Sequence, residues 1–404
     1  MKKIMIVAML FAGTVSTFAG DSPALKAILS IGTYDEAVKA VKANVNTLLN
    51  NEEKAKAYDH LVELAKKDYN AQSEISDKNT VYKQMGQNSK IVPYDTLKMG
   101  NAAVNVVENA LLRYKYDNMP NEKGKIKPKY DGDKAVVYAI RTNLVNIAGG
   151  YWNNNNNLFE KFTGAYLDSK NEPFFAGIDT TAEKTFLGQF AYLASYVALQ
   201  NKEYDKVERW VPYAERDEKY AKDAFSWKLE AMEKSCKTRE DSVNYKNKLQ
   251  ALFNQRPNDQ TVFARLYGVT SALDGNAAGE AMLEGVLAKD PKNFVALFYK
   301  GQDQFDKRKY DDAVKTLKAA AEANPTSPFP WFYIAACYQN KAADAKVIAT
   351  ANVLLEEAIK NYDKCKELDP KQQQMRWGQL RYNAYYARYG ADDAKTKAAE
   401  ADKY

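Results

Sequence analysis

Prolines recur at a fixed distance in the carboxy-terminal half of this chain. Pro257, Pro291 and Pro325 lie 34 residues apart, and Pro370 follows 45 residues later. A constant period of about 20 to 50 residues marks structural units that cannot bury their apolar faces alone and therefore stack on one another. The spacing predicts a pile of similar units in place of a single closed domain.

Each unit has the pattern of two amphipathic helices. Between Asn293 and Asn324, apolar or small residues recur three and four positions apart on either side of a turn at Arg308 and Lys309. The following unit repeats the pattern with Trp331, Ile334, Ala335 and Tyr338, and then with Ala358, Tyr362 and Cys365. No segment alternates apolar and polar residues between turn signals. We therefore predict an all-α fold of stacked helix hairpins.

These positions resemble the tetratricopeptide repeat. The resemblance is carried by Trp331, Ile334, Ala335 and Tyr338, together with Ala313, Leu317 and Ala320 ahead of Pro325. It implies an α-solenoid, a superhelix of tetratricopeptide units, over residues 171–404. The repeat at 328–370 carries an 11-residue insertion, which we expect to lengthen both of its helices. The last run, from Arg376 to Arg388, is expected to form a capping helix with its aromatic side inward.

Upstream the resemblance weakens. The segments "KEYDKVERWVPYA" from Lys202 and "GTYDEAVKAV" from Gly32 match "RKYDDAVKTLKAA" from Arg308. We expect a four-residue insertion in the unit at 222–257, with Trp227, Leu249 and Leu252 in its core. Residues 20–170 are predicted to be divergent helical hairpins. They contain a turn at a run of five asparagines, a linker at 68–93 and a loop at 117–133.

The first 19 residues have the pattern of a secretory signal peptide. Lys2 and Lys3 precede an apolar run from Ile4 to Ala12, which is too short to anchor a chain in a bilayer. No later segment has 18 uninterrupted apolar residues, so we expect no integral membrane segment after removal of the signal. A signal followed by divergent hairpins and tetratricopeptide units is similar to exported proteins of Bacteroides-type Gram-negative bacteria. This similarity implies a periplasmic or extracellular location.

Residues typical of catalysis or metal binding are scarce. His60 is the only histidine, and the chain has no CxxC or HExxH zinc motif and no glycine-rich phosphate loop. We therefore expect no catalytic residue, no metal, no cofactor and no enzymatic activity. The net charge of +6 falls to about +4 without the two signal lysines and is too small to predict nucleic-acid binding. The three cysteines, Cys236, Cys337 and Cys365, are predicted to be free and buried.

The tetratricopeptide resemblance also implies a binding surface. In the family, positions two, five, six, nine and twelve of each repeat face a concave groove. In this chain those positions are Val295, Phe298, Tyr299, Gln302 and Phe305, and then Phe329, Phe332, Tyr333, Ala336 and Gln339. Aromatic side chains supply large contact area at small entropic cost, which suits capture of a peptide or protein segment. For Phe305 and Tyr333, packing between repeats is an equally good interpretation.

Three functions remain open on this basis. The first is a non-enzymatic protein-interaction scaffold or adaptor that binds a peptide or protein segment in the aromatic groove. The second is a glycan-binding envelope component, because aromatic platforms also bind sugars, although no cysteine for lipid attachment lies near residue 20. The third is an enzyme with a dispersed pair of carboxylates, which needs no local motif.

Overall fold

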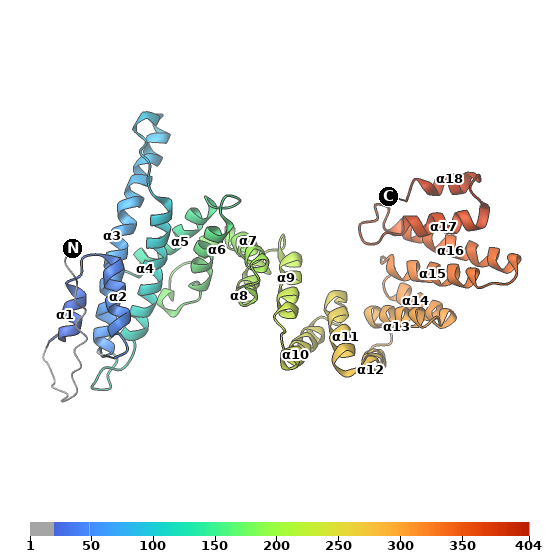
Figure 1. Ribbon diagram of the computed structural model, residues 1–404, viewed down its shortest axis with the longest axis horizontal. Coiled ribbons are helices and arrows are strands. Elements are labelled where there is room, and N and C mark those ends of the chain that lie inside the picture. The colour runs from blue at the N-terminus through green and yellow to red at the C-terminus, as the bar shows by residue number, and fades with distance from the viewer. Residues whose placement is uncertain (1–19, 48, 404) are drawn as a thin grey trace, which may run out of the picture. The chain divides into compact units, whose positions relative to one another are not determined.

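The computed structural model describes residues 20–47 and 49–403, so the predicted signal peptide lies outside the described residues. Over these ranges the regular structure consists of α-helices and short 3-10 helices, without a strand (Figure 1). The all-α prediction is confirmed. The chain forms two compact units, which divide between Ala231 and Met232 inside a helix, and each unit is described by itself.

Unit 1 is a series of helices that pack in consecutive pairs. Its α-helices are α1 (Pro23–Leu29), α2 (Tyr34–Asn44), α3 (Asn51–Gln84), α4 (Thr96–Asp117), α5 (Lys134–Gly149), α6 (Asn156–Asp168), α7 (Leu187–Gln200), α8 (Tyr204–Ala214) and α9 (Ala221–Lys234). Three short 3-10 helices are η1 (Asn88–Lys90), η2 (Pro173–Phe175) and η3 (Thr181–Thr185). The closest pairs are α3 with α4, α5 with α6, and α7 with α8.

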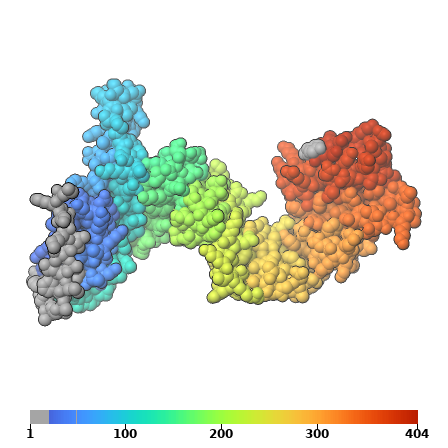
Figure 2. Space-filling model, viewed as in Figure 1, coloured from blue at the N-terminus to red at the C-terminus, as the bar shows by residue number. Residues whose placement is uncertain are grey.

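The hairpin of α3 and α4 corrects one prediction. The linker expected at 68–93 is helical as far as Gln84, because α3 continues past Asp68 for four more turns. The end of α3 extends beyond the other helices of unit 1 (Figures 1 and 2). By contrast, the loop expected at 117–133 is confirmed between α4 and α5, and the asparagine turn is confirmed by Asn155, whose side chain caps α6.

Two buried arginines hold unit 1 together. Arg113 of α4 pairs with Asp59 at 2.8 Å and with Asp133 at 2.5 Å, which fastens α4 to α3 and to the start of α5. Arg141 of α5 pairs with Glu183 of η3 at 3.0 Å, and both side chains are buried. Because a buried charge is costly without a partner, Arg113 holds α4 against α3 and the start of α5, and Arg141 holds the η3 segment against α5.

Unit 2 continues the pattern of helix hairpins. Its helices after α9 are α10 (Arg239–Gln255), α11 (Gln260–Asp274), α12 (Asn276–Lys289), α13 (Phe294–Asp306), α14 (Tyr310–Ala323), α15 (Phe329–Ala343), α16 (Ile348–Leu368), α17 (Gly378–Tyr389) and α18 (Ala394–Glu400). Each helix from α10 onward packs on the next. Pro257, Pro291, Pro325 and Pro370 all lie in the corners between successive hairpins, as their spacing predicts.

The matching sequence segments adopt matching structures. Helices α2, α8 and α14 begin at Tyr34, Tyr204 and Tyr310, the shared tyrosine of the three segments. Lys202 lies two residues before Tyr204 and has a positive φ angle of 61°. Arg308 lies two residues before Tyr310 and has a positive φ angle of 57°. The left-handed residue reverses the chain between the two helices of a hairpin, so the segments are the same turn used repeatedly.

The insertion in the 328–370 repeat lengthens its two helices unequally. Helix α15 has 15 residues against 13 in α13, whereas α16 has 21 against 14 in α14. The added turns leave Val347, Ile348 and Val353 exposed at the start of α16. The extra length therefore extends past the neighbouring repeat.

Some core and cysteine predictions need correction. In the unit predicted at 222–257, Leu249 is buried and Leu252 is half-buried, but Trp227 stacks on Tyr192 of α7 with ring centres 4.4 Å apart and so belongs to unit 1. Cys337 and Cys365 are free thiols, as predicted. Cys337 and Cys365 are buried, whereas Cys236 is only partly buried because it follows the end of α9.

The carboxy-terminal run divides its side chains between the interior and the surface. Trp377 is fully buried, and its indole Nε1 donates to the Asp369 carbonyl at 2.9 Å. Tyr385 is buried against α16, while Tyr386 is half-exposed. Helix α18 covers part of α17. Within the described ranges, no helix combines the length and the apolar character needed to cross a membrane.

Candidate functional site

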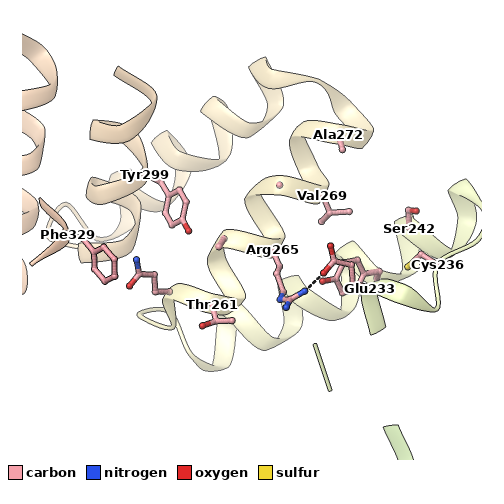
Figure 3. Close-up of a pocket in the computed structure, with 13 residues that line it drawn as sticks. Glu233, Cys236, Ser242, Thr261, Arg265, Val269, Ala272, Tyr299 and Phe329 are labelled. Atoms are coloured by element: carbon pink, nitrogen blue, oxygen red, sulfur yellow. Dashed lines mark hydrogen bonds and ion pairs between the residues drawn. The ribbon is translucent and has the colours of Figure 1, made fainter. Parts of the chain in front are cut away.

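A hollow of unit 2 lies along one face of α11. This helix buries Val262, Phe263 and Leu266 on the side toward its neighbours. The opposite side lines a hollow of about 840 Å³ and consists of Gln260, Thr261, Ala264, Arg265, Gly268, Val269 and Ala272 (Figure 3). Their spacing follows a single helical stripe, so the period that builds the core also leaves this stripe free.

The walls of the hollow come from four neighbouring segments. Glu233 and Cys236 lie at and after the end of α9, and Ser242 and Tyr245 lie on α10. On the other side Tyr299 of α13 and Phe329 of α15 close the hollow with aromatic rings (Figure 3). The hollow therefore has a polar end and an aromatic end, joined by a floor of small side chains.

Gly268 gives the floor its depth. A Cβ atom built on this glycine meets no atom within 4 Å, although the residue lies well inside α11. Helical glycines that serve packing look different, because a Cβ on Gly301 would lie 2.6 Å from Cγ of the buried Leu317. Packing therefore does not explain Gly268, and the missing side chain leaves space above the floor of the hollow.

The polar end contains one ion pair and one buried hydroxyl. The guanidinium of Arg265 pairs with the carboxylate of Glu233. Tyr245 is 6% exposed, and among the described residues its hydroxyl finds no hydrogen-bond partner. Burial raises the pKa of Tyr245, and the nearby Arg265 partly counteracts that rise. At the aromatic end, burial raises the pKa of Tyr299 to about 12, so both hydroxyls keep their protons at neutral pH and can donate hydrogen bonds.

Of the eight residues predicted to form the groove, only Tyr299 and Phe329 line this hollow. The other six are Phe298, Gln302, Phe305, Phe332, Tyr333 and Gln339. The first three contact Tyr333 between successive hairpins, whereas Phe332 and Gln339 contact Tyr362 within the hairpin of α15 and α16. Phe298 is 4% exposed, with its ring centre 5.7 Å from that of Tyr333. A binding role for these residues stays a prediction.

Hydrogen bonds and ring contacts explain why these six residues pack together. Tyr333 accepts a hydrogen bond from Gln302 at 2.8 Å and meets Phe305 at 5.4 Å between ring centres. Tyr362 donates to Gln339 at 2.9 Å and contacts Phe332. Because α13 and α15 touch each other directly, the rings of Phe298, Phe305 and Tyr333 fill the space between them.

Sequence reasoning overlooked the floor of the hollow, although the repeat contained the signal for it. Moving the five groove positions of α13 back by one period of 34 residues gives Thr261, Ala264, Arg265, Gly268 and Ser271. The first four of these line the hollow. Their side chains are small or charged, so a search for aromatic residues misses them.

Potential metal ligands do not gather at one place within residues 20–47 and 49–403. No group of three or more histidine, cysteine or acidic side chains there could hold a metal ion. His60 is half-buried, and its Nε2 lies 2.8 Å from the Ile31 carbonyl oxygen, a contact that fixes the turn after α1. This contact gives His60 a structural role.

Comparison with known proteins gives only distant likenesses. No protein-family model matches the chain, and no curated protein sequence matches it. Among solved structures, the human IFIT1 dimer with PPP-AAAA is similar at 12% identity, with a TM-score of 0.35, over 94% of this chain and 75% of that one. A chain of the Naa15/Naa10 complex bound to HypK-THB is similar at 14% identity and a TM-score of 0.28, over 94% of this chain and 63% of that one. Such low TM-scores say nothing about a ligand or partner here.

The class of this protein follows from its own helices. Consecutive hairpins, a 34-residue spacing and prolines in the corners define an α-helical repeat protein of tetratricopeptide-like fold. Stacked hairpins of this architecture leave extended open surfaces, and in unit 2 the α11 hollow lies on such a surface.

Proposed function

We propose that this protein is an exported, non-enzymatic interaction scaffold of a Gram-negative cell envelope, and that unit 2 holds an extended peptide segment of a protein partner in the α11 hollow. The observation that carries the proposal is the open floor at Gly268 between a polar end and an aromatic end. The stripe from Thr261 to Ala272 covers 11 helical steps, or roughly 16 Å. About five residues of extended chain have this length.

The chemistry of the hollow supports binding in preference to catalysis. Its lining contains one carboxylate, Glu233, and that group already pairs with Arg265. A hydrolase that works with two carboxylates needs a second acid nearby. Aromatic walls, a small-residue floor and a few hydrogen-bonding groups are what a peptide segment requires for affinity and direction.

A single substitution that fills the hollow with a side chain tests this function. The change Gly268→Tyr places a large ring in the hollow from a site that has space for it. Gly285→Tyr is the matched control, because Gly285 is also an exposed helical glycine with no atom near its Cβ position but lies on α12 outside the hollow. We expect the purified full chain and the Gly285 variant to bind displayed peptides, and the Gly268 variant to lose this binding. Equal binding by both variants would refute the proposal.

One observation gives the glycan alternative a location. In unit 1, a second hollow of about 820 Å³ between α3, α4 and α5 is lined by Tyr69, Tyr94 and Tyr151 and by the amides of Asn70, Asn143 and Asn146. Rings and amides of this kind bind the apolar faces and hydroxyl groups of sugars. Affinity electrophoresis in gels that contain soluble polysaccharides tests this candidate. Retardation that is lost in Tyr94→Ala would favour it over peptide binding.

A further inference from the structure

The polar end of the α11 hollow has an unused hydrogen-bond donor. Tyr245 is buried on α10 together with Leu249 and Phe253. Within the described part of the chain its buried hydroxyl has no hydrogen-bond partner, and Tyr245 is one of the residues that line the hollow. A buried polar group without a partner costs on the order of 1–3 kcal/mol, so a ligand atom that satisfies it is favoured.

Arg265 supplies donors beside this hydroxyl. A guanidinium has five N–H groups, and the bond that joins Arg265 to Glu233 uses Nη1. The Arg265 side chain is 26% exposed, and that of Glu233 is 57% exposed. A surface pair of this kind is weak, so the Glu233 carboxylate exchanges readily with another carboxylate.

We propose that this end of the hollow binds the carboxylate of an aspartate or glutamate side chain within the partner segment, held by the Tyr245 hydroxyl and the Arg265 guanidinium. The inference rests on the proposed function and names the residue type that the hollow selects. An oxygen that accepts from both groups satisfies Tyr245, and its negative charge matches Arg265. A basic side chain of the partner could not accept a hydrogen bond from Tyr245 or Arg265, and the charge of Arg265 would repel it.

Glu233 then acts as an internal competitor. Its carboxylate occupies Arg265 when no segment is bound, and an acidic segment has to displace it. Removal of the Glu233 charge therefore strengthens binding of an acidic segment. If the hollow instead recognised a basic segment through Glu233, the same change would weaken binding. The two possibilities predict opposite signs for one substitution.

The test is a selection from a random ten-residue peptide library displayed on phage, with both peptide ends joined to other sequence so that no free carboxy terminus is present. The full chain is the target, and Gly268→Tyr is the counter-target that removes peptides bound elsewhere. We expect one position of the enriched peptides to be aspartate or glutamate. A synthetic peptide from this set should bind at least tenfold more weakly when that residue becomes Gln or Lys.

Variants of the protein complete the test. We expect Arg265→Gln to weaken binding about tenfold, Tyr245→Phe about threefold or more, and Glu233→Gln to strengthen it about threefold. A misfolded protein cannot produce that gain. Hollow-dependent peptides without an acidic preference, or weaker binding by Glu233→Gln, would overturn this inference and leave the proposed function standing. A library with no peptide sensitive to Gly268→Tyr would overturn both.

Discussion

The change Gly268→Ala tests the open floor of the hollow through stability alone. Gly268 is a helical residue of α11, and a Cβ atom there meets nothing within 4 Å. Alanine in a helix interior is favoured over glycine by about 1 kcal/mol, and no clash opposes this gain. We therefore expect α11 to become more stable by about 1 kcal/mol. The same argument applies to Gly285 in α12, which is equally unobstructed.

Gly301→Ala should destabilise its helix, in contrast to Gly268→Ala. Its Cβ atom would lie 2.6 Å from Cγ and 2.7 Å from Cδ2 of Leu317, which is fully buried and cannot move aside. Overpacking of a core costs about 1–3 kcal/mol, which exceeds the gain in helix propensity. We expect a net loss on the order of 1 kcal/mol. All three substitutions replace glycine by alanine, so whether each one stabilises or destabilises its helix depends on the surrounding atoms alone.

Hydrogen exchange with mass spectrometry measures these effects helix by helix. In repeat proteins each unit responds mainly to its neighbours, so a global melting curve would dilute the signal. A gain of about 1 kcal/mol slows exchange roughly fivefold. Peptides from α11 should slow in Gly268→Ala, and peptides from α12 should slow in Gly285→Ala. Faster exchange in Gly268→Ala would mean that the floor is occupied by packed atoms, and the argument for a ligand there would fail.

Three further outcomes follow from buried groups. Burial alone would raise the pKa of Glu183, but hydrogen bonds from Tyr138 and Tyr166 and the charge of Arg141 lower it to about 2. Because the pKa is lowered, the Glu183 carboxylate stabilises unit 1 above about pH 4.5 and loses this effect as the pH falls toward 2. The total loss is roughly 3 kcal/mol. The free energy of unfolding in urea should therefore depend less on pH in Glu183→Gln than in the unsubstituted protein. Burial raises the pKa of Cys337 and of Cys365 to about 12, so a disulfide reagent at pH 8 should modify both only after unfolding, and early modification would contradict the buried positions. Trp377→Phe removes a buried indole hydrogen bond and should lower the free energy of unfolding by about 1–3 kcal/mol. An unchanged midpoint of urea unfolding would contradict this prediction.

The repeat could be predicted from the sequence because proline marks the ends of helices directly. Pro291 and Pro325 break the helical hydrogen-bond pattern, so their spacing is the spacing of the corners. The length of α3 could not be predicted in the same way. No proline interrupts residues 68–84, and its polar exposed face past Tyr69 looks the same in a linker and in a solvated helix.

The site was harder to predict than the fold, because an aromatic side chain has the same signal whether it packs or binds. Phe298 and Tyr333 lie at family groove positions, yet each is committed to the contact between α13 and α15. Tyr299 lies one residue further along and reaches the hollow. The unusual feature of the floor is an absence of side chain at Gly268, and only the position of neighbouring atoms reveals that the space is empty.

Cys236 offers a practical way to detect binding in the α11 hollow. It lines the cavity and is partly exposed, while the other two thiols are sealed in the core of unit 2. A maleimide dye would therefore attach to the native chain at one place, beside Arg265 and Glu233 and without engineered substitutions. Its emission would report the arrival of a peptide in real time, and the unlabelled protein would compete for the same peptide as an internal standard.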